Sequence, residues 1–246
     1  MSGSSLLGPP RVRRRLAALP DKPLNFDPAG LEHASPATGW TITDLCQALP
    51  SEPPGAPVGD GSWQIARRLM RGYEFADPSI VRAYYDPAAP LEGRNMLLKL
   101  QALGVFWLFV GVRVSEVYDR IRRAASGEIR VWGWNYQTLD GHVEMGQMDW
   151  EVWKWPDSGA VEFRVHAVSR RAPIANPIVR AGFHLLRGRE RDAFLQSTKR
   201  RMRTFTELAL QTAGRGEPLR SAAVELTARR SRPSDQAHDE LARRLR

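Results

Sequence analysis

Residues 130–155, RVWGWNYQTLDGHVEMGQMDWEVWKW, form the stretch that decides the fold. Two runs of alternating character flank Asp140-Gly141, a pair typical of tight turns, so the stretch predicts a β-hairpin. A three-residue loop at 139–141 brings the even-numbered residues of both strands to one face and leaves the other face with residues that water tolerates. The even-numbered face then holds Trp132, Trp134, Tyr136, Thr138, His142, Glu144, Met148 and Trp150.

The same loop predicts which residues stand opposite each other across the hairpin. The expected pairs are Thr138 with His142, Tyr136 with Glu144, Trp134 with Gly146, and Trp132 with Met148. A polar cluster would then cap a bed of tryptophans, and the glycine opposite Trp134 would leave unfilled volume. This arrangement predicts one wall of a small-molecule pocket.

Other stretches supply the remaining elements of the fold. Alternation at 96–101, 110–114 and 161–167 predicts further strands. Helices are expected at 62–71 and, from Asp-Pro and Asn-Pro cap signatures, at 78–85 and from 177 to about 210, with Gly188 breaking or kinking the last. Its apolar stripe is Leu195, Thr198, Met202, Phe205 and Ala209. These elements predict an α+β fold, a curved antiparallel sheet around a long C-terminal helix with a cavity between them.

The predicted globular domain spans residues 23–212 and includes a Pro/Gly-rich extended arm at 36–61. Residues 1–22 and the arginine-rich tail at 213–246 are expected to be disordered. Of the net charge of +9, residues 1–26 contribute +4 and residues 187–246 contribute +7, whereas the central part is slightly acidic. Basicity therefore belongs to the two ends of the chain.

Several classes of protein are disfavoured by what the sequence lacks. Cys46 is the only cysteine, which excludes a disulfide framework and a cysteine-rich metal site. The longest apolar run, residues 105–112, is too short to cross a bilayer, and no secretory segment is recognisable, so a soluble cytoplasmic protein is expected. Since no Gly-rich phosphate loop is present, no cofactor is expected. No feature indicates an oligomeric state.

With its elements placed, the chain is similar to the family named domain of unknown function nineteen-ninety. The stretches that carry the resemblance are LNFDPAG (24–30), GYEFADPSIVRAYYDP (72–87), PLEGRNMLLKL (90–100), WGWNYQTLDGHVEMGQMDWEVWKW (132–155) and FRVHAVSRRA (163–172). Arg171 departs from the family pattern, which has a proline there. The order of elements also resembles the START-like, or SRPBCC, helix-grip superfamily, whose members bind lipids, hormones and polyketides. The resemblance implies a ligand cavity and carries over no catalytic residues.

Three functions are compatible with these residues. The first is binding of a small apolar or amphipathic molecule on the tryptophan bed, with Ser169 and Arg170 near the pocket mouth. The second is an enzyme with His142 and Glu144 as acid/base groups. The alternative for this pair is structural: the two residues form hydrogen bonds with each other and with the loop backbone, and so hold the end of the hairpin closed. One His and one Glu are too few for a metal site. The third is a nucleic-acid or membrane-surface adaptor working through the basic ends, which is disfavoured because no nucleic-acid module is present.

Overall fold

The computed structural model describes residues 9–102, 106–124, 127–173 and 177–213. Seven strands form one antiparallel sheet in the order β1-β7-β6-β5-β4-β3-β2. The strands are β1 (Thr41–Leu49), β2 (Val81–Tyr84), β3 (Asn95–Ala102), β4 (Phe106–Ala124), β5 (Gly127–Thr138), β6 (Glu144–Lys154) and β7 (Val161–Arg171). The helices are α1 (Pro10–Ala17), α2 (Ser62–Arg71) and α3 (Pro177–Ala213), with short 3-10 turns η1 (Pro28–His33) and η2 (Pro36–Thr38).

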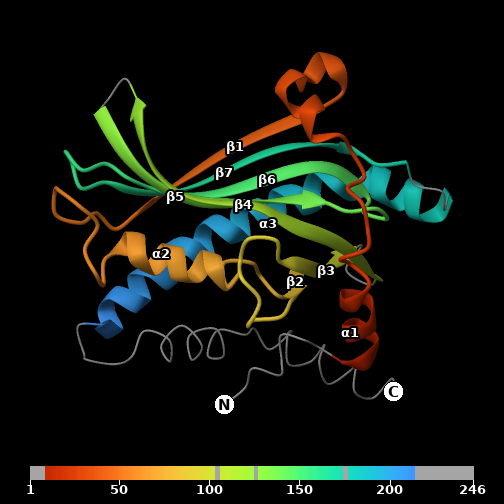
Figure 1. The fold of residues 1–246 in the computed structure, drawn as a ribbon, viewed down its shortest axis with the longest axis horizontal. Coiled ribbons are helices and arrows are strands. Elements are labelled where there is room, and N and C mark those ends of the chain that lie inside the picture. Colours follow the sequence, from red (N-terminus) through yellow and green to blue (C-terminus); the bar gives the residue numbers. More distant parts are fainter. Residues whose placement is uncertain (1–8, 103–105, 125–126, 174–176, 214–246) are drawn as a thin grey trace.

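The sheet curves over α2 and α3, which both lie on one side of it, here called the inner face (Figure 1). The apolar stripe predicted on the C-terminal helix packs into the core that this face forms. Its members are 0–4% exposed, and the apolar ones belong to one cluster with the inner-face side chains. Burial of large apolar side chains on both layers is the main favourable term that holds helix and sheet together. The α+β architecture of a curved antiparallel sheet around a long C-terminal helix is thus confirmed.

The hairpin of β5 and β6 has the predicted faces but a different register. Trp134 stands opposite Trp150 and Tyr136 stands opposite Met148. Even-numbered residues do share the inner face, yet every predicted cross-strand pair is wrong by four positions, because the pairing stops at Gln137–Gln147 and leaves a longer loop. The prediction of unfilled volume beside Trp134 is also wrong, because Trp150 and not Gly146 stands opposite Trp134.

Gly146 marks the place where β6 leaves β5. Its φ is +142°, and an added Cβ would collide with the Val168 carbonyl oxygen of β7. The glycine is therefore required by the close approach of two backbones and not by space for a ligand. Here a side chain replaces the backbone hydrogen bonding between β5 and β6: the Thr138 hydroxyl accepts the Gly146 N–H at 2.9 Å.

The outer face is less open to water than its polar residues suggested. Val131 is fully buried and Glu151 is 8% exposed. The Glu151 carboxylate accepts bonds from the Tyr118 hydroxyl at 2.6 Å, the Arg122 guanidinium at 2.7 Å and the Trp153 indole at 2.6 Å. Long and aromatic side chains lying flat on the sheet thus cover the residues beneath them.

The helix predicted at 78–85 is wrong, because residues 81–84 form β2 instead. The Asp77 carboxylate accepts bonds from the N–H and hydroxyl of Ser79, as expected for a cap, but only one turn forms. Val81 then pairs with Leu100 of β3. Pairing with a neighbouring strand therefore overrides the local capping signal.

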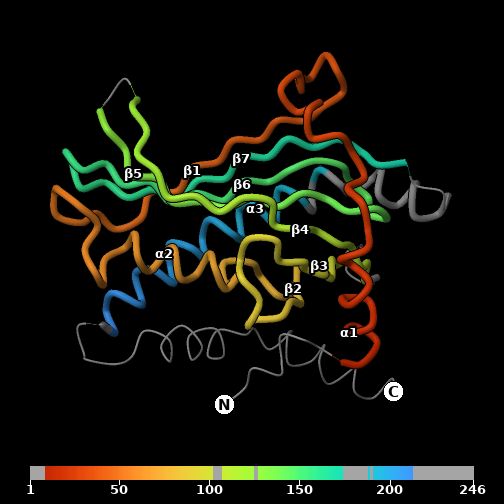
Figure 2. Tube along the Cα trace, in the orientation of Figure 1, coloured from red at the N-terminus to blue at the C-terminus, as the bar shows by residue number. Residues whose placement is uncertain are grey.

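The N-terminal third is more ordered than its composition predicted. Part of the range expected to be disordered forms α1, and Val12 of this helix and Leu19 just after it are buried against Leu97 and Leu139. The arm predicted at 36–61 contains β1, which pairs with β7 over nine residues. Figure 2 shows this segment rising from α1 past the β5–β6 loop to β1.

The C-terminal helix is longer and more regular than expected. It continues through Gly188 without a break, from Pro177 to Ala213. A single glycine in a helix costs only about 1 kcal/mol relative to alanine, which weakens the helix without ending it. The predictions for residues 1–8 and for the tail at 214–246 fall outside the described residues.

Candidate functional site

Five rings on the inner face form what is here called the aromatic cluster: Tyr73, Phe75, Trp134, Tyr136 and Trp150. Neighbouring ring centroids lie 4.4–6.3 Å apart, the range of favourable aromatic pairs. All five side chains are at most 7% exposed. Two predicted pocket tryptophans therefore pack against aromatic side chains of the segment after α2, and a ligand that reaches their faces has to displace that segment's rings or lie beside them.

Tyr73 reaches the cluster from an unusual backbone position. Its φ is +56°, the left-handed region that glycine normally occupies. The Glu74 N–H bonds to the Leu69 carbonyl and the Tyr73 N–H to the Met70 carbonyl, which together form the Schellman motif that ends α2. A tyrosine in the glycine position of this motif is strained, and the strain is offset by burial of its ring.

The cluster is rich in hydrogen-bond donors. The indole N–H groups of Trp134 and Trp150 are buried without a hydrogen-bond partner, and the Tyr73 hydroxyl meets only the hydroxyl of Tyr136. The Tyr136 hydroxyl donates only to the Met148 sulfur, at 3.3 Å, and a thioether is a weak acceptor. Burial raises the pKa of Tyr136 to about 12 and that of Tyr73 well above its usual range, so both hydroxyls stay protonated.

Arg191 of α3 provides a charged group at the end of this cluster. Its guanidinium donates to the Ser169 hydroxyl of β7 at 2.9 Å and to the Thr43 hydroxyl of β1 at 2.6 Å. It is half-buried, and its charge acts to lower the pKa of Tyr136 against the larger effect of burial. Sequence reasoning missed Arg191. It stands four residues before Leu195 and therefore lies on the apolar stripe, where a charged residue could have marked a functional position.

The predicted acid/base residues lie in a knot that holds the β5–β6 loop. Asn25 bonds through its side chain to the Thr138 hydroxyl at 2.6 Å and to the Glu144 carbonyl at 2.9 Å. His142 Nδ1 accepts the Glu144 backbone N–H at 2.9 Å. Burial lowers the pKa of His142 to about 4, so the ring is neutral at neutral pH. Its contact with Glu144 is to backbone, which gives the ring a structural role in the loop.

The remaining predicted site residues lie apart from the cluster. Trp132 is at the other end of the inner face, where the Arg67 guanidinium lies 5.1 Å from its ring and 3.9 Å from the Asp119 carboxylate. Arg170 is on the outer side of β7, stacked 4.6 Å over Trp40. The structure therefore brings together Trp134, Tyr136, Met148, Trp150 and Ser169, and places Trp132 and Arg170 elsewhere. Thr138 and His142 hold the β5–β6 loop, whereas the charge of Glu144 also acts on Tyr136 and raises the pKa of its hydroxyl.

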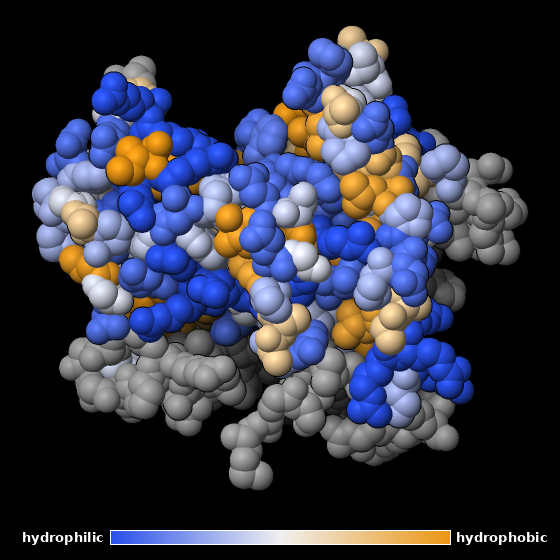
Figure 3. All heavy atoms as spheres, viewed as in Figure 1, coloured by the Kyte–Doolittle hydropathy of each residue, from blue (hydrophilic) through white to orange (hydrophobic). Residues whose placement is uncertain are grey.

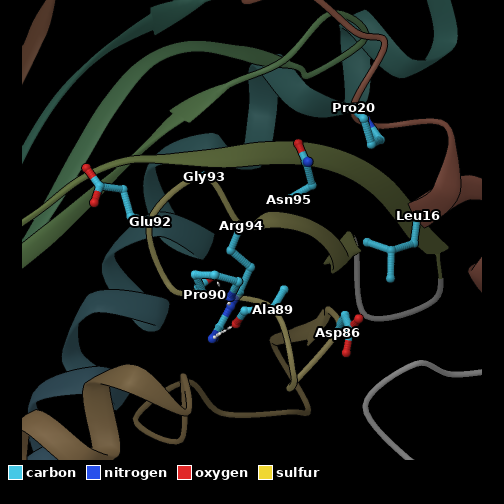
Figure 4. A pocket seen from close by; sticks show the side chains of 9 residues that line it. All are labelled: Leu16, Pro20, Asp86, Ala89, Pro90, Glu92, Gly93, Arg94 and Asn95. Atoms are coloured by element: carbon cyan, nitrogen blue, oxygen red, sulfur yellow. Dashed lines mark hydrogen bonds between the residues drawn. The ribbon is translucent and has the colours of Figure 1, made fainter.

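A separate surface hollow of about 270 Å³ lies between α1 and the segment that precedes β3 (Figure 4). Leu16, Pro20 and Pro90 contribute apolar surface, and Arg94 also lines the hollow. The Arg94 guanidinium donates to the Ala89 carbonyl at 2.8 Å, which fixes the loop rather than presenting the charge. The side of the molecule in Figure 3 is otherwise largely hydrophilic, with apolar residues in separate patches.

Metal-ligating clusters are absent from the part of the chain that the structure describes. Its residues contain no group of three or more His, Cys, Asp or Glu side chains placed to hold a metal ion. Among the same residues, no helix combines the length and apolar character needed to span a membrane.

Fold and site together define an α+β protein whose curved sheet closes over a C-terminal helix, with aromatic and polar groups between the two layers. The chain belongs to the family described as Domain of unknown function (DUF1990), which matches residues 26–200. The family resemblance of the sequence is thus confirmed. No protein with a curated description matches this sequence.

Solved structures with a similar arrangement are distant in sequence. The di-domain ARO/CYC StfQ from the steffimycin biosynthetic pathway is 12% identical, with a TM-score of 0.47; the match covers 75% of this chain and 55% of that one. Ara h 8.0201 is 8% identical over 67% of this chain and 98% of its own, with a TM-score of 0.38. The major latex-like protein 151 from Panax ginseng is 8% identical over 68% and 97%, with a TM-score of 0.37. Because these TM-scores lie below 0.5, the fold assignment rests on this chain's own topology.

Proposed function

We propose that this protein binds a small, largely apolar molecule with one polar end, between the inner face of the sheet and α3. The observation that carries the proposal is the position of Arg191. Ligand sites are typically apolar walls in which a few placed polar groups fix the orientation of the ligand. Arg191, Ser169 and Thr43 form such a polar group at the end of the aromatic cluster.

The cost of placing a charge there supports a role for it. A guanidinium loses solvation when it is half-buried between helix and sheet, and a neutral side chain on the apolar stripe would avoid that loss. Arginine presents several N–H donors in a flat fork that suits carboxylate and similar groups. The polar end of the ligand would therefore lie at Arg191.

The apolar body of the ligand would lie along the next row of the sheet. Tyr136, Met148 and Ala167 stand side by side across β5, β6 and β7 on the inner face. Met148 is only partly buried, and its flexible thioether adapts to ligands of different shape. This row connects Arg191 with the aromatic cluster.

The proposal is tested by dye binding to the full chain with a matched pair of variants. The anionic dye 1-anilinonaphthalene-8-sulfonate should bind with a defined stoichiometry. Arg191→Met should weaken that binding roughly ten-fold or more, since it removes charge-assisted bonds. Arg170→Met, on the outer side of β7, should leave it unchanged.

Equal effects of the two substitutions, or no saturable binding by the native protein, would refute the proposal. Native mass spectrometry of protein purified from its own host gives an independent reading. A co-purified mass that is lost in Arg191→Met but kept in Arg170→Met is the expected result.

A further inference from the structure

The aromatic cluster has more hydrogen-bond donors than acceptors. Tyr73, Tyr136, Trp134 and Trp150 supply two hydroxyl and two indole N–H groups. The two indole N–H groups are buried without a partner, the Tyr73 hydroxyl meets only the Tyr136 hydroxyl, and the Tyr136 hydroxyl in turn donates only to sulfur. Buried polar groups in folded proteins are nearly always hydrogen-bonded, so donors left over in one place indicate an acceptor that belongs there.

We infer that the cluster holds a neutral carbonyl oxygen of the bound molecule, with the Tyr73 hydroxyl as one of its donors. The inference rests on the proposed function and names the chemical class of the ligand: a flat, largely apolar ketone, quinone or amide. An indole N–H only donates, and a protonated hydroxyl donates one bond, so the complement of this cluster is an acceptor.

The acceptor is uncharged because of where it lies. The rings around it are at most 7% exposed and carry no formal charge. Burial keeps Tyr73 and Tyr136 protonated because a tyrosinate anion would lose its solvation there. A carboxylate in the same place would lose solvation for the same reason and is therefore disfavoured. An anionic end of the ligand belongs instead at Arg191, beyond Tyr136.

The backbone of Tyr73 is consistent with a functional position. A left-handed residue that closes a Schellman motif is usually glycine, yet a tyrosine stands here at a conformational cost. Its hydroxyl lies within hydrogen-bonding reach of the Tyr136 hydroxyl. Two hydroxyls this close can donate to the same carbonyl oxygen.

The test compares two probes of nearly the same shape, 9-fluorenone and fluorene, which differ in the carbonyl group. Equilibrium dialysis with the full chain should show fluorenone binding roughly three- to ten-fold more tightly, the value of about one net hydrogen bond. Fluorene is the more apolar molecule, so hydrophobic transfer alone would give the opposite preference. The infrared carbonyl stretch of bound fluorenone should move below its position in an apolar solvent.

Matched variants locate the donor. Tyr73→Phe keeps the ring and removes one hydroxyl, so the preference for fluorenone should largely disappear while fluorene binding stays the same. Tyr118→Phe removes a hydroxyl bonded to Glu151 on the outer face and should change neither probe. The infrared measurement needs only the native protein, which keeps the test valid if a variant is unstable.

The outcomes distinguish failure of the inference from failure of the proposed function. Equal affinities with an unshifted carbonyl stretch would mean that water satisfies the donors; the inference then fails and the proposed function stands. A preference for fluorenone that survives in Tyr73→Phe would also overturn the inference. If neither probe binds and the anionic dye does not bind either, the proposed function fails and the inference fails with it.

Discussion

Replacing Lys154 by methionine is predicted to lower the free energy of unfolding by about 3–5 kcal/mol. The Lys154 ammonium lies on the inner face, fully buried, 2.6 Å from the Glu52 carboxylate, whose side chain is 3% exposed. It also donates to the Pro53 carbonyl at 2.9 Å. Methionine fills a similar volume, so the cost comes from leaving the Glu52 carboxylate buried without its counter-charge and not from a cavity.

The structure also predicts how this loss depends on Glu52. Glu52 accepts the backbone N–H groups of Val58 at 3.2 Å and of Trp63 at 2.7 Å, and so tethers the start of α2. Glu52→Gln keeps an acceptor oxygen for these groups but removes the charge. The double variant should therefore be more stable than Lys154→Met alone, with a coupling energy of about 2–3 kcal/mol.

Urea unfolding followed by tryptophan fluorescence measures all three variants. Arg203→Met is the control, because Arg203 pairs with Glu207 on the exposed side of α3 at 2.8 Å and should cost under about 0.5 kcal/mol. A loss below about 1 kcal/mol for Lys154→Met, or strict additivity with Glu52→Gln, would show that the pair is not a buried ion pair in solution.

Three further predictions concern packing, backbone and pH. Phe205→Ala should cost about 3–5 kcal/mol in denaturant melts, since Phe205 is 3% exposed, and a change under about 0.5 kcal/mol would place it outside the core. Gly146→Ala should lower the free energy of unfolding by at least about 2 kcal/mol, because the added Cβ meets the Val168 carbonyl. Gly188→Ala, with open space around it, should instead stabilise α3 by about 0.5–1 kcal/mol. Similar effects at the two glycines would contradict this. His142 is neutral in the folded protein down to about pH 4 and protonates near pH 6.5 when unfolded. Stability should fall as pH drops through that window, by up to about 1.4 kcal/mol per unit, relative to His142→Asn, which cannot titrate; parallel pH curves for the two proteins would refute it.

Periodicity alone was enough to place the faces of the main elements. A strand alternates its side chains between two faces, so the pattern of residues 130–155 assigned Trp134, Tyr136 and Trp150 to the inner face. The apolar stripe of α3 followed in the same way from helical spacing. These predictions depend only on the geometry of one strand or one helix.

The hairpin register could not be derived from the same pattern. Alternation tells odd offsets from even ones but does not choose among even offsets, and the predicted pairs differ from the observed ones by four positions. The longer loop of the observed register is held in part by Asn25, which bonds to Thr138 from 113 residues away. No local signal contains that contact.

Capping signals show the same division between local and long-range information. Pro177 begins α3 as the Asn-Pro signature predicted. Asp77 makes its predicted cap, but Val81 enters the sheet and pairs with Leu100. Local hydrogen bonds favour one turn of helix, and pairing with β3 then turns the next residues into a strand.

The sequence by itself determined which residues of β5, β6 and α3 face inward, because side-chain direction along a strand or helix is a local property of the backbone. Only the tertiary structure decided what those residues meet. It brought Tyr73 into the tryptophans through a left-handed turn, and it set Arg191 of α3 against Ser169 and Thr43 of two different strands. Such contacts depend on how distant segments pack together, and packing between layers is not encoded in the period of any one of them.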